Sequence, residues 1–216
     1  MADRPRVTLC MAMTLDGLVS KPGERLPSFT TKEDHRRLFE HRARADAVIV
    51  GAGTVRTEKF QPLVRAEEWS TWRKARGCSA HPDVAVVSRS GNLKLDDAYF
   101  GPEQLFHIFS QASAPVNAPS NITWHHHSKL SMKPVIHSLS QFGYQNLLLE
   151  GGPSLAYSFF SEDLIDEIRL TLAAKIFGGD SGKGISHGTI LDSFRNYQWR
   201  GMEVHDSDLF LHLVKK

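Results

Sequence analysis

A strand that ends in a glycine turn is the feature that most constrains the fold of this chain. Residues 47–50 are uniformly apolar and run directly into a Gly-x-Gly-Thr turn at residues 51–54. Such a run predicts a strand buried on both faces, followed by a helix. The first turn of a helix has backbone N–H groups without partners and carries partial positive charge. Gly51, Gly53 and Thr54 are therefore candidates for binding phosphate, although a tight strand–helix corner explains the glycines equally well.

The same pattern returns at residues 146–155, where Asn-Leu-Leu-Leu-Glu precedes Gly-Gly-Pro-Ser-Leu. Two such turns in one α/β chain indicate a single extended ligand with more than one phosphate group. The first turn lacks the G-x-G-x-x-G spacing of a dinucleotide-binding Rossmann domain. Glu150 closes the second strand, and ligands of open α/β sheets bind beyond the strand ends. We therefore favour a role for its carboxylate in binding a substrate ring over a purely local role at the helix start.

Strand-like and helix-like segments alternate along the chain. This alternation predicts an α/β fold with a mostly parallel central sheet, helices on both faces and an antiparallel C-terminal hairpin. No repeat or linker interrupts residues 1–216, so we expect one domain. Residues 21–27 and 111–131 are rich in turn-forming and polar residues and predict loops. We expect strands at 6–13, 48–50, 84–87, 105–109, 122–124, 147–149 and 167–173, helices from Thr31 and at 54–57, 66–77, 133–142 and 154–160, and a hairpin of 199–205 with 209–214.

Composition excludes several classes of partner. The net charge of +2 gives no electrostatic argument for nucleic acid or a membrane surface. No apolar run approaches the ~20 residues that span a bilayer, and the N-terminus lacks the apolar core of a signal peptide. The two cysteines, Cys10 and Cys78, form no disulfide framework, so we expect a cytoplasmic protein. The histidines at 125–127 and His107 suggest a metal site, but adjacent side chains splay apart and we expect none.

Three further groups of polar residues are candidates for the site. Ser88 and Arg89 end a predicted strand and suit a ribose 2′-phosphate, although a solvated surface pair explains them equally well. Asp16 begins an Asp-Gly pair, which by itself favours a simple turn. One helix carries four arginines, Arg36, Arg37, Arg42 and Arg44. Most of them should be solvated, while one or two face the ligand crevice and bind a substrate phosphate.

Five sequence blocks, taken in order, resemble the reductase domain of riboflavin biosynthesis. That domain has the dihydrofolate reductase fold and occurs alone or fused behind a zinc deaminase. The resemblance covers nearly the whole chain, and no deaminase signature accompanies it, so a separate deaminase would be required in that pathway. The blocks are residues 13–17, 45–56, 149–155, 164–170 and 177–179.

The resemblance implies an activity and a set of site residues. The family reduces the ribosylamino group of a phosphorylated aminopyrimidine to a ribitylamino group with NADPH, and a homodimer is expected. Substrate positions fall on Arg42, Arg65 and Glu150. With the turn residues argued above, the cofactor set is Ala12, Thr30, Gly51, Gly53, Thr54, Glu58, Ser88, Arg89, Gly151, Gly152, Pro153, Ser154 and Leu155.

The implied mechanism assigns a role to each charged group. The sugar ring must open to an imine before hydride reaches C1′ of the substrate. We assign Glu150 to binding the substrate and steadying its cationic form, and Asp16 to assisting ring opening. Arg42 and Arg65 anchor the phosphate away from the reacting carbon.

Departures from the family pattern keep two alternatives open. Leu18 stands where a basic residue is usual, Thr30 lacks the usual preceding Trp, Glu58 begins Glu-Lys-Phe in place of Asp-x-Pro, and Ala174 replaces a common Pro. These changes cluster near the expected substrate pocket. One alternative is a reductase of another heterocycle, such as a pterin, and the other is an NADPH-binding protein without turnover. The sequence does not separate the deaminated from the undeaminated pyrimidine.

Overall fold

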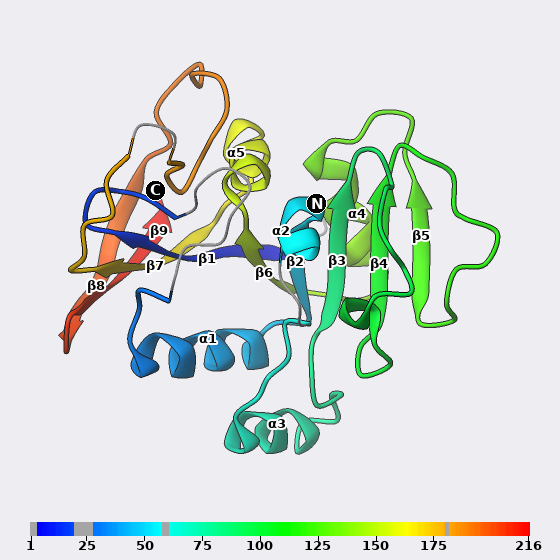
Figure 1. Cartoon of the computed structure of the whole chain (residues 1–216), viewed down its shortest axis with the longest axis horizontal. Coiled ribbons are helices and arrows are strands. Elements are labelled where there is room, and N and C mark those ends of the chain that lie inside the picture. The colour runs from blue at the N-terminus through cyan, green and yellow to red at the C-terminus, as the bar shows by residue number, and fades with distance from the viewer. Residues whose placement is uncertain (1–3, 20–27, 58–60, 180–181) are drawn as a thin grey trace.

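The computed structural model describes residues 4–19, 28–57, 61–179 and 182–216. Its described strands form one nine-stranded sheet in the order β5-β4-β3-β2-β6-β1-β7-β9-β8 (Figure 1). The strands are β1 (Arg6–Thr14), β2 (Ala47–Gly51), β3 (Asp83–Ser88), β4 (Phe106–Ser110), β5 (Ile122–His126), β6 (Asn146–Gly151), β7 (Glu167–Ala173), β8 (Tyr197–His205) and β9 (Asp208–Lys215). The helices are α1 (Lys32–Arg44), α2 (Ala52–Thr57), α3 (Glu67–Lys74), α4 (Met132–Gln141), α5 (Pro153–Ser161) and a 3₁₀ turn, η1 (Ala98–Phe100).

The direction of the strands confirms the predicted sheet. Strands β1 to β7 pair in parallel, while β9 is antiparallel to both β7 and β8. Ala47, Val48 and Ile49 of β2 are fully buried, as expected of a strand covered on both faces. Because the first seven strands run in one direction, their carboxyl ends, including those of β2, β3 and β6, meet at one edge of the sheet.

Helices cover both faces of the sheet, again as predicted. On one face α4 and α5 pack on β1, β2 and β6 through side chains that include Val135, Leu139 and Phe159. On the other face the aromatic side chains of η1 and Val55 of α2 pack on β2, β3 and β4. Helix α1 also lies on this second side, with α3 against it (Figure 1).

Helix α1 is fixed to the sheet mainly by polar contacts, and its one buried residue is Ala43. Its N-cap Thr31 donates from both its N–H and its hydroxyl to Asp208 of β9, at 2.8 Å each, so the hydroxyl does not cap the helix. One turn later, Asp34 accepts a 2.6 Å hydrogen bond from Thr171 of β7. Arg37 then pairs with Glu203 of β8 at 2.6 Å. The C-terminal strands therefore hold this N-terminal helix in place.

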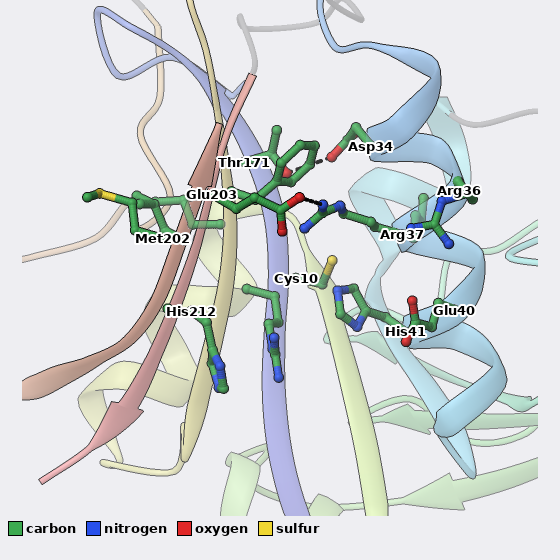
Figure 2. A pocket seen from close by; sticks show the side chains of 16 residues that line it. Cys10, Asp34, Arg36, Arg37, Glu40, His41, Thr171, Met202, Glu203 and His212 are labelled. Atoms are coloured by element: carbon green, nitrogen blue, oxygen red, sulfur yellow. Dashed lines mark hydrogen bonds and ion pairs between the residues drawn. The ribbon is translucent and has the colours of Figure 1, made fainter. Parts of the chain in front are cut away.

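A cavity of about 480 Å³ lies beneath these contacts, between α1 and strands β7, β8 and β9 (Figure 2). Cys10, His41 and His212 line it together with the paired groups Arg37 and Glu203. Two of the four candidate arginines of α1, Arg36 and Arg37, line this cavity, but Arg42, Glu150, Asp16 and the described cofactor candidates do not. We therefore place the site elsewhere.

Several element boundaries differ from the prediction. Helix α2 begins at Ala52, earlier than expected, and α3 ends at Lys74, before Gly77. Gly77 has a φ of 73° and its N–H donates to Lys74 O, so residues 75–77 form the turn that ends the helix. The 3₁₀ turn η1 was not predicted, because a single capped turn has no periodicity to detect. The predicted loop at 21–27 lies outside the described residues. Within the described part of the chain, no helix is both long and apolar enough to cross a membrane.

Candidate active site

The two predicted glycine turns lie side by side at the carboxyl edge of the sheet. Val50 of β2 pairs directly with Gly151 of β6. A Cβ atom added to Gly51 would lie 3.7 Å from the Cβ of Leu155, so the first turn approaches the second closely. The Thr54 hydroxyl also donates to Gly151 O at 3.4 Å. The candidates from both motifs therefore form one continuous surface.

Glu150 is the extra residue of a β-bulge between these turns. Ile49 pairs with Leu149 but Val50 pairs with Gly151, so Glu150 has no partner in β2. A bulge of this kind redirects a side chain, and bulges are frequent beside active sites. Gly151, the next residue, has a φ of 83°, a conformation that favours glycine.

Arg42, in the last turn of α1, binds the Glu150 carboxylate with two parallel hydrogen bonds. Arg42 Nε and Nη2 lie 2.7 Å from Oε1 and Oε2 of Glu150, and each side chain is 13% exposed. Arg42 Nη1 also donates to Leu63 O at 3.1 Å. Burial alone would lower the pKa of Arg42, but the Glu150 charge and these hydrogen bonds outweigh it and raise that pKa. The structure thus joins two of the three predicted substrate residues.

The third predicted substrate residue, Arg65, lies two residues after Leu63 and is exposed.

Cys10 of β1 is close enough to Glu150 for the carboxylate charge to act on it. Burial, and then this charge, raise the pKa of the Cys10 thiol. A raised pKa disfavours the thiolate, which is the form in which a cysteine acts as a nucleophile.

Asp16 closes the turn after β1 and is not beside Glu150. Its carboxylate accepts a hydrogen bond from the Thr14 hydroxyl and others from the N–H groups of Phe177 and Gly178, at 3.2 and 2.6 Å. The Thr14 and Gly178 bonds lower the pKa of Asp16, so the group is ionised at neutral pH. Leu9 is the last residue of β1 that pairs with β6, and Thr14 lies five residues further, or ~16 Å along a strand. The turn interpretation therefore accounts for the described contacts of Asp16.

Comparison with known proteins decides the family. The model of the RibD C-terminal domain matches residues 5–211. The chain belongs to that family. A similar curated protein is the 2,5-diamino-6-ribosylamino-4(3H)-pyrimidinone 5′-phosphate reductase of Archaeoglobus fulgidus, at 26% identity over 191 residues, 86% of this chain and 87% of that protein. The predicted membership of a reductase family of riboflavin biosynthesis is thereby confirmed.

Solved structures of other proteins have the same fold as this RibD C-terminal domain. A deaminase/5-amino-6-(5-phosphoribosylamino)uracil reductase from Thermotoga maritima superposes with a TM-score of 0.82 at 23% identity, covering 99% of this chain. The chain spans 57% of the length of that protein. Dihydrofolate reductase from Enterococcus faecalis has a TM-score of 0.54 at 13% identity, with 97% of this chain and 96% of that one covered. The predicted dihydrofolate reductase-like fold is confirmed.

Reductases of this family use a nicotinamide cofactor, and the edge of the sheet in this RibD C-terminal domain has donors that fit one. Ser88 is 2% exposed, and its hydroxyl is a buried polar atom without a partner among the described residues. It lies one residue beyond Val87, which pairs with Gly51. Arg89 follows it and is exposed. A Cβ added to Gly53 would meet nothing within 4 Å, so a ligand can reach the backbone there.

The remaining cofactor candidates come from neighbouring segments. Gly152 is the N-cap of α5 and Pro153 its first residue, with Ser154 following; no side chain caps this helix start. Ala12 pairs with Thr171 in β7, and Thr30 directly precedes the α1 N-cap. Glu58 lies outside the described residues. Apart from Glu58, the candidates come from five segments around the carboxyl ends of β1, β2, β3 and β6.

Two of the histidines considered for a metal site, His107 and His125, belong to a hydrogen-bonded chain. His107 Nε2 lies 3.0 Å from the Tyr144 hydroxyl and its Nδ1 lies 3.2 Å from His125 Nε2. Tyr144 in turn donates to Asp83. Among the described residues, no group of three or more His, Cys, Asp or Glu side chains could hold a metal ion.

Proposed function

We propose that this protein is an NADPH-dependent reductase of riboflavin biosynthesis. It converts a phosphoribosylamino-pyrimidine to the corresponding ribitylamino-pyrimidine phosphate. The observation that carries the proposal is the bidentate pair of Arg42 and Glu150, located directly beside two adjoining glycine turns. The name of the Archaeoglobus relative favours the undeaminated substrate, 2,5-diamino-6-ribosylamino-4(3H)-pyrimidinone 5′-phosphate.

The glycine turns and the end of β3 hold the cofactor in this proposal. Backbone N–H groups of residues 51–54 and of Gly151, Gly152 and Ser154 face its phosphates, since helix starts favour anions. The buried Ser88 hydroxyl and the adjacent Arg89 bind the 2′-phosphate that distinguishes NADPH from NADH. When bound, the cofactor supplies hydride. Ala12 and Thr30, with Glu58, complete the proposed set.

The charged side chains act on the substrate. Glu150 accepts hydrogen bonds from the pyrimidine and stabilises positive charge as the sugar opens. Arg42 and Arg65 bind the phosphate and orient the substrate. Asp16 assists ring opening in this proposal as a counter-charge, because a lowered pKa keeps its carboxylate ionised and makes it a weak proton acceptor.

The decisive test is oxidation of NADPH with the diamino pyrimidine phosphate, with the product identified by mass. A product two hydrogens heavier supports the proposal, and faster reaction with the deaminated uracil analogue would reassign the substrate within it. Dihydrofolate is the matched comparison for a pterin reductase. NADPH binding seen by fluorescence, without oxidation by any of the three, would contradict the proposal and favour a non-catalytic protein.

A homodimer in a reducing, cytoplasmic location is part of the proposal. Strand β8 is an edge strand with three large exposed apolar residues, Trp199, Met202 and Val204, at 65, 72 and 73% exposure. Such residues on an edge favour association with a second chain. Both cysteines are free. Sedimentation at micromolar concentration tests the dimer, and a monomer there would contradict it.

A further inference from the structure

Arg73 is a buried arginine whose described hydrogen bonds all go to backbone carbonyl oxygens. It comes from α3, is 5% exposed, and pairs with no carboxylate among the described residues. Nη1 donates to Ala43 O at 2.9 Å and to Ala45 O at 2.6 Å. Nε donates to Ser79 O at 2.9 Å and Nη2 to His81 O at 3.2 Å. A buried cation is costly, so a network this complete requires an explanation.

One side of this network holds the end of α1. Ala43 directly follows Arg42, and Ala45 is the C-cap of α1, whose N–H donates to Arg42 O at 3.2 Å. The last carbonyl groups of a helix have no partners within it, and a cation placed there stabilises them. Arg73 therefore fixes the backbone on which Arg42 is carried.

The other side of the network holds the segment that leads to Arg65. Arg73 fixes the backbone of His81 through its hydrogen bond to His81 O. The His81 ring in turn accepts a hydrogen bond at Nδ1 from the Val64 N–H, at 3.2 Å. The preceding carbonyl, Leu63 O, accepts from Arg42 Nη1. A closed circuit of contacts therefore runs from Arg73 through His81 and residues 63–64 to Arg42, and back to Arg73 through Ala43.

We propose that Arg73 is a positioning residue for the substrate end of the site. It sets the position of Arg42 relative to the segment 61–65, which carries Arg65. The inference rests on the proposed function, because it assumes that these two arginines bind the substrate phosphate. A guanidinium is required, since its planar fork reaches carbonyl groups from two segments at once whereas a lysine ammonium is a single point.

Arg73→Lys and Arg73→Met test the proposal, with Arg76→Met as the matched control. Arg76 lies just beyond α3, is exposed, and its guanidinium stacks 3.8 Å from the Trp72 ring. For both Arg73 variants we expect KM for the diamino pyrimidine phosphate to rise roughly tenfold while KM for NADPH stays within about twofold. Amide exchange at Val64 should accelerate in both. Arg76→Met should change neither.

His81→Ala provides a second test if an Arg73 variant fails to fold. It removes the Val64 acceptor without uncovering a charge, and should raise the same KM and speed exchange at Val64. An unchanged KM for the substrate in both Arg73→Lys and His81→Ala would overturn this inference and leave the proposed function untouched. A general loss of turnover with both KM values unchanged would also overturn it, since that indicates a merely structural role. If the unaltered protein failed to oxidise NADPH with the substrate, the proposed function would fail, and this inference with it.

Discussion

Arg42 and Glu150 stand 108 residues apart in the sequence and form a bidentate ion pair in which each side chain is 13% exposed. The cost of removing two charges from water can exceed the free energy of their attraction, so the pair is not an argument for the stability of the folded protein. Its geometry is more informative. The described contacts use three of the five N–H donors of Arg42, which leaves two for a substrate oxygen while Glu150 stays paired.

Glu150→Gln should lower turnover at least tenfold, about 1.4 kcal/mol of barrier, while NADPH affinity stays near that of the unaltered protein. Glutamine keeps the size and one acceptor but cannot stabilise positive charge on the substrate. Steady-state kinetics and NADPH fluorescence measure the two effects separately. Glu40→Gln is the control, because Glu40 makes a 3.0 Å pair with Arg44 on the outer part of α1. Normal turnover of Glu150→Gln on its substrate would transfer the catalytic role to Asp16.

Arg89→Ala should weaken the binding of NADPH by roughly 1.5–3 kcal/mol and the binding of NADH far less. The lost charge-assisted hydrogen bond involves the 2′-phosphate, which only NADPH has. Fluorescence titration with each cofactor gives the difference. Arg56→Ala serves as the comparison, since Arg56 is exposed on α2 at the same edge and is not assigned a phosphate. Equal losses for the two cofactors would show that Arg89 does not recognise the phosphate.

Asp16→Asn should remove part of the acid sensitivity of folding. The unfolded chain protonates Asp16 near its ordinary pKa of 3.8, whereas hydrogen bonds from Thr14 and Gly178 lower that pKa in the folded protein. The stabilisation is thus complete above that pH and is lost as the pH falls below it. Urea denaturation at a series of pH values should show a shallower decline for the variant. Asp96→Asn, at an exposed carboxylate, is the control, and identical curves for Asp16→Asn and the unaltered protein would refute the prediction.

His125→Phe should flatten the loss of stability between about pH 6.5 and 4. Burial, together with the nearby His107 and His127, lowers the pKa of His125 to about 4 from its ordinary 6.5. In that interval the unfolded chain binds the additional proton, so stability falls as the pH falls. Phenylalanine retains the stacking on Phe109, which has a centroid distance of 4.5 Å, but cannot titrate. Equal pH dependence of the two proteins in urea denaturation would exclude His125 as the source.

The sequence predicted those parts of the molecule that depend on local patterns. An apolar run and a glycine turn are local, so β2, β6 and the paired turns were expected, as was Glu150 at a strand end. The choice of Arg42 came from the family resemblance, because four arginines on one helix look alike in sequence. In the structure Arg36 and Arg37 bind Glu33, Arg44 binds Glu40, and Arg42 turns to the sheet.

Contacts between distant segments were beyond such reasoning. Asp16 binds Gly178, 162 residues away, and no local pattern predicts that partner. No local pattern singles out Arg73, since nothing in the sequence distinguishes a buried arginine from a solvated one. Its role depends on carbonyl groups, which every residue possesses.

The attachment of α1 to Asp208 has a consequence for how the molecule is assembled. Thr31 and Asp208 are 177 residues apart, and little apolar burial holds the helix without them. Contacts of such long range form late, because the intervening chain must first be ordered. On a ribosome, the N-terminal end of α1 cannot make these contacts until β9 has emerged, so this helix is fully anchored only after nearly all of the chain has been synthesised.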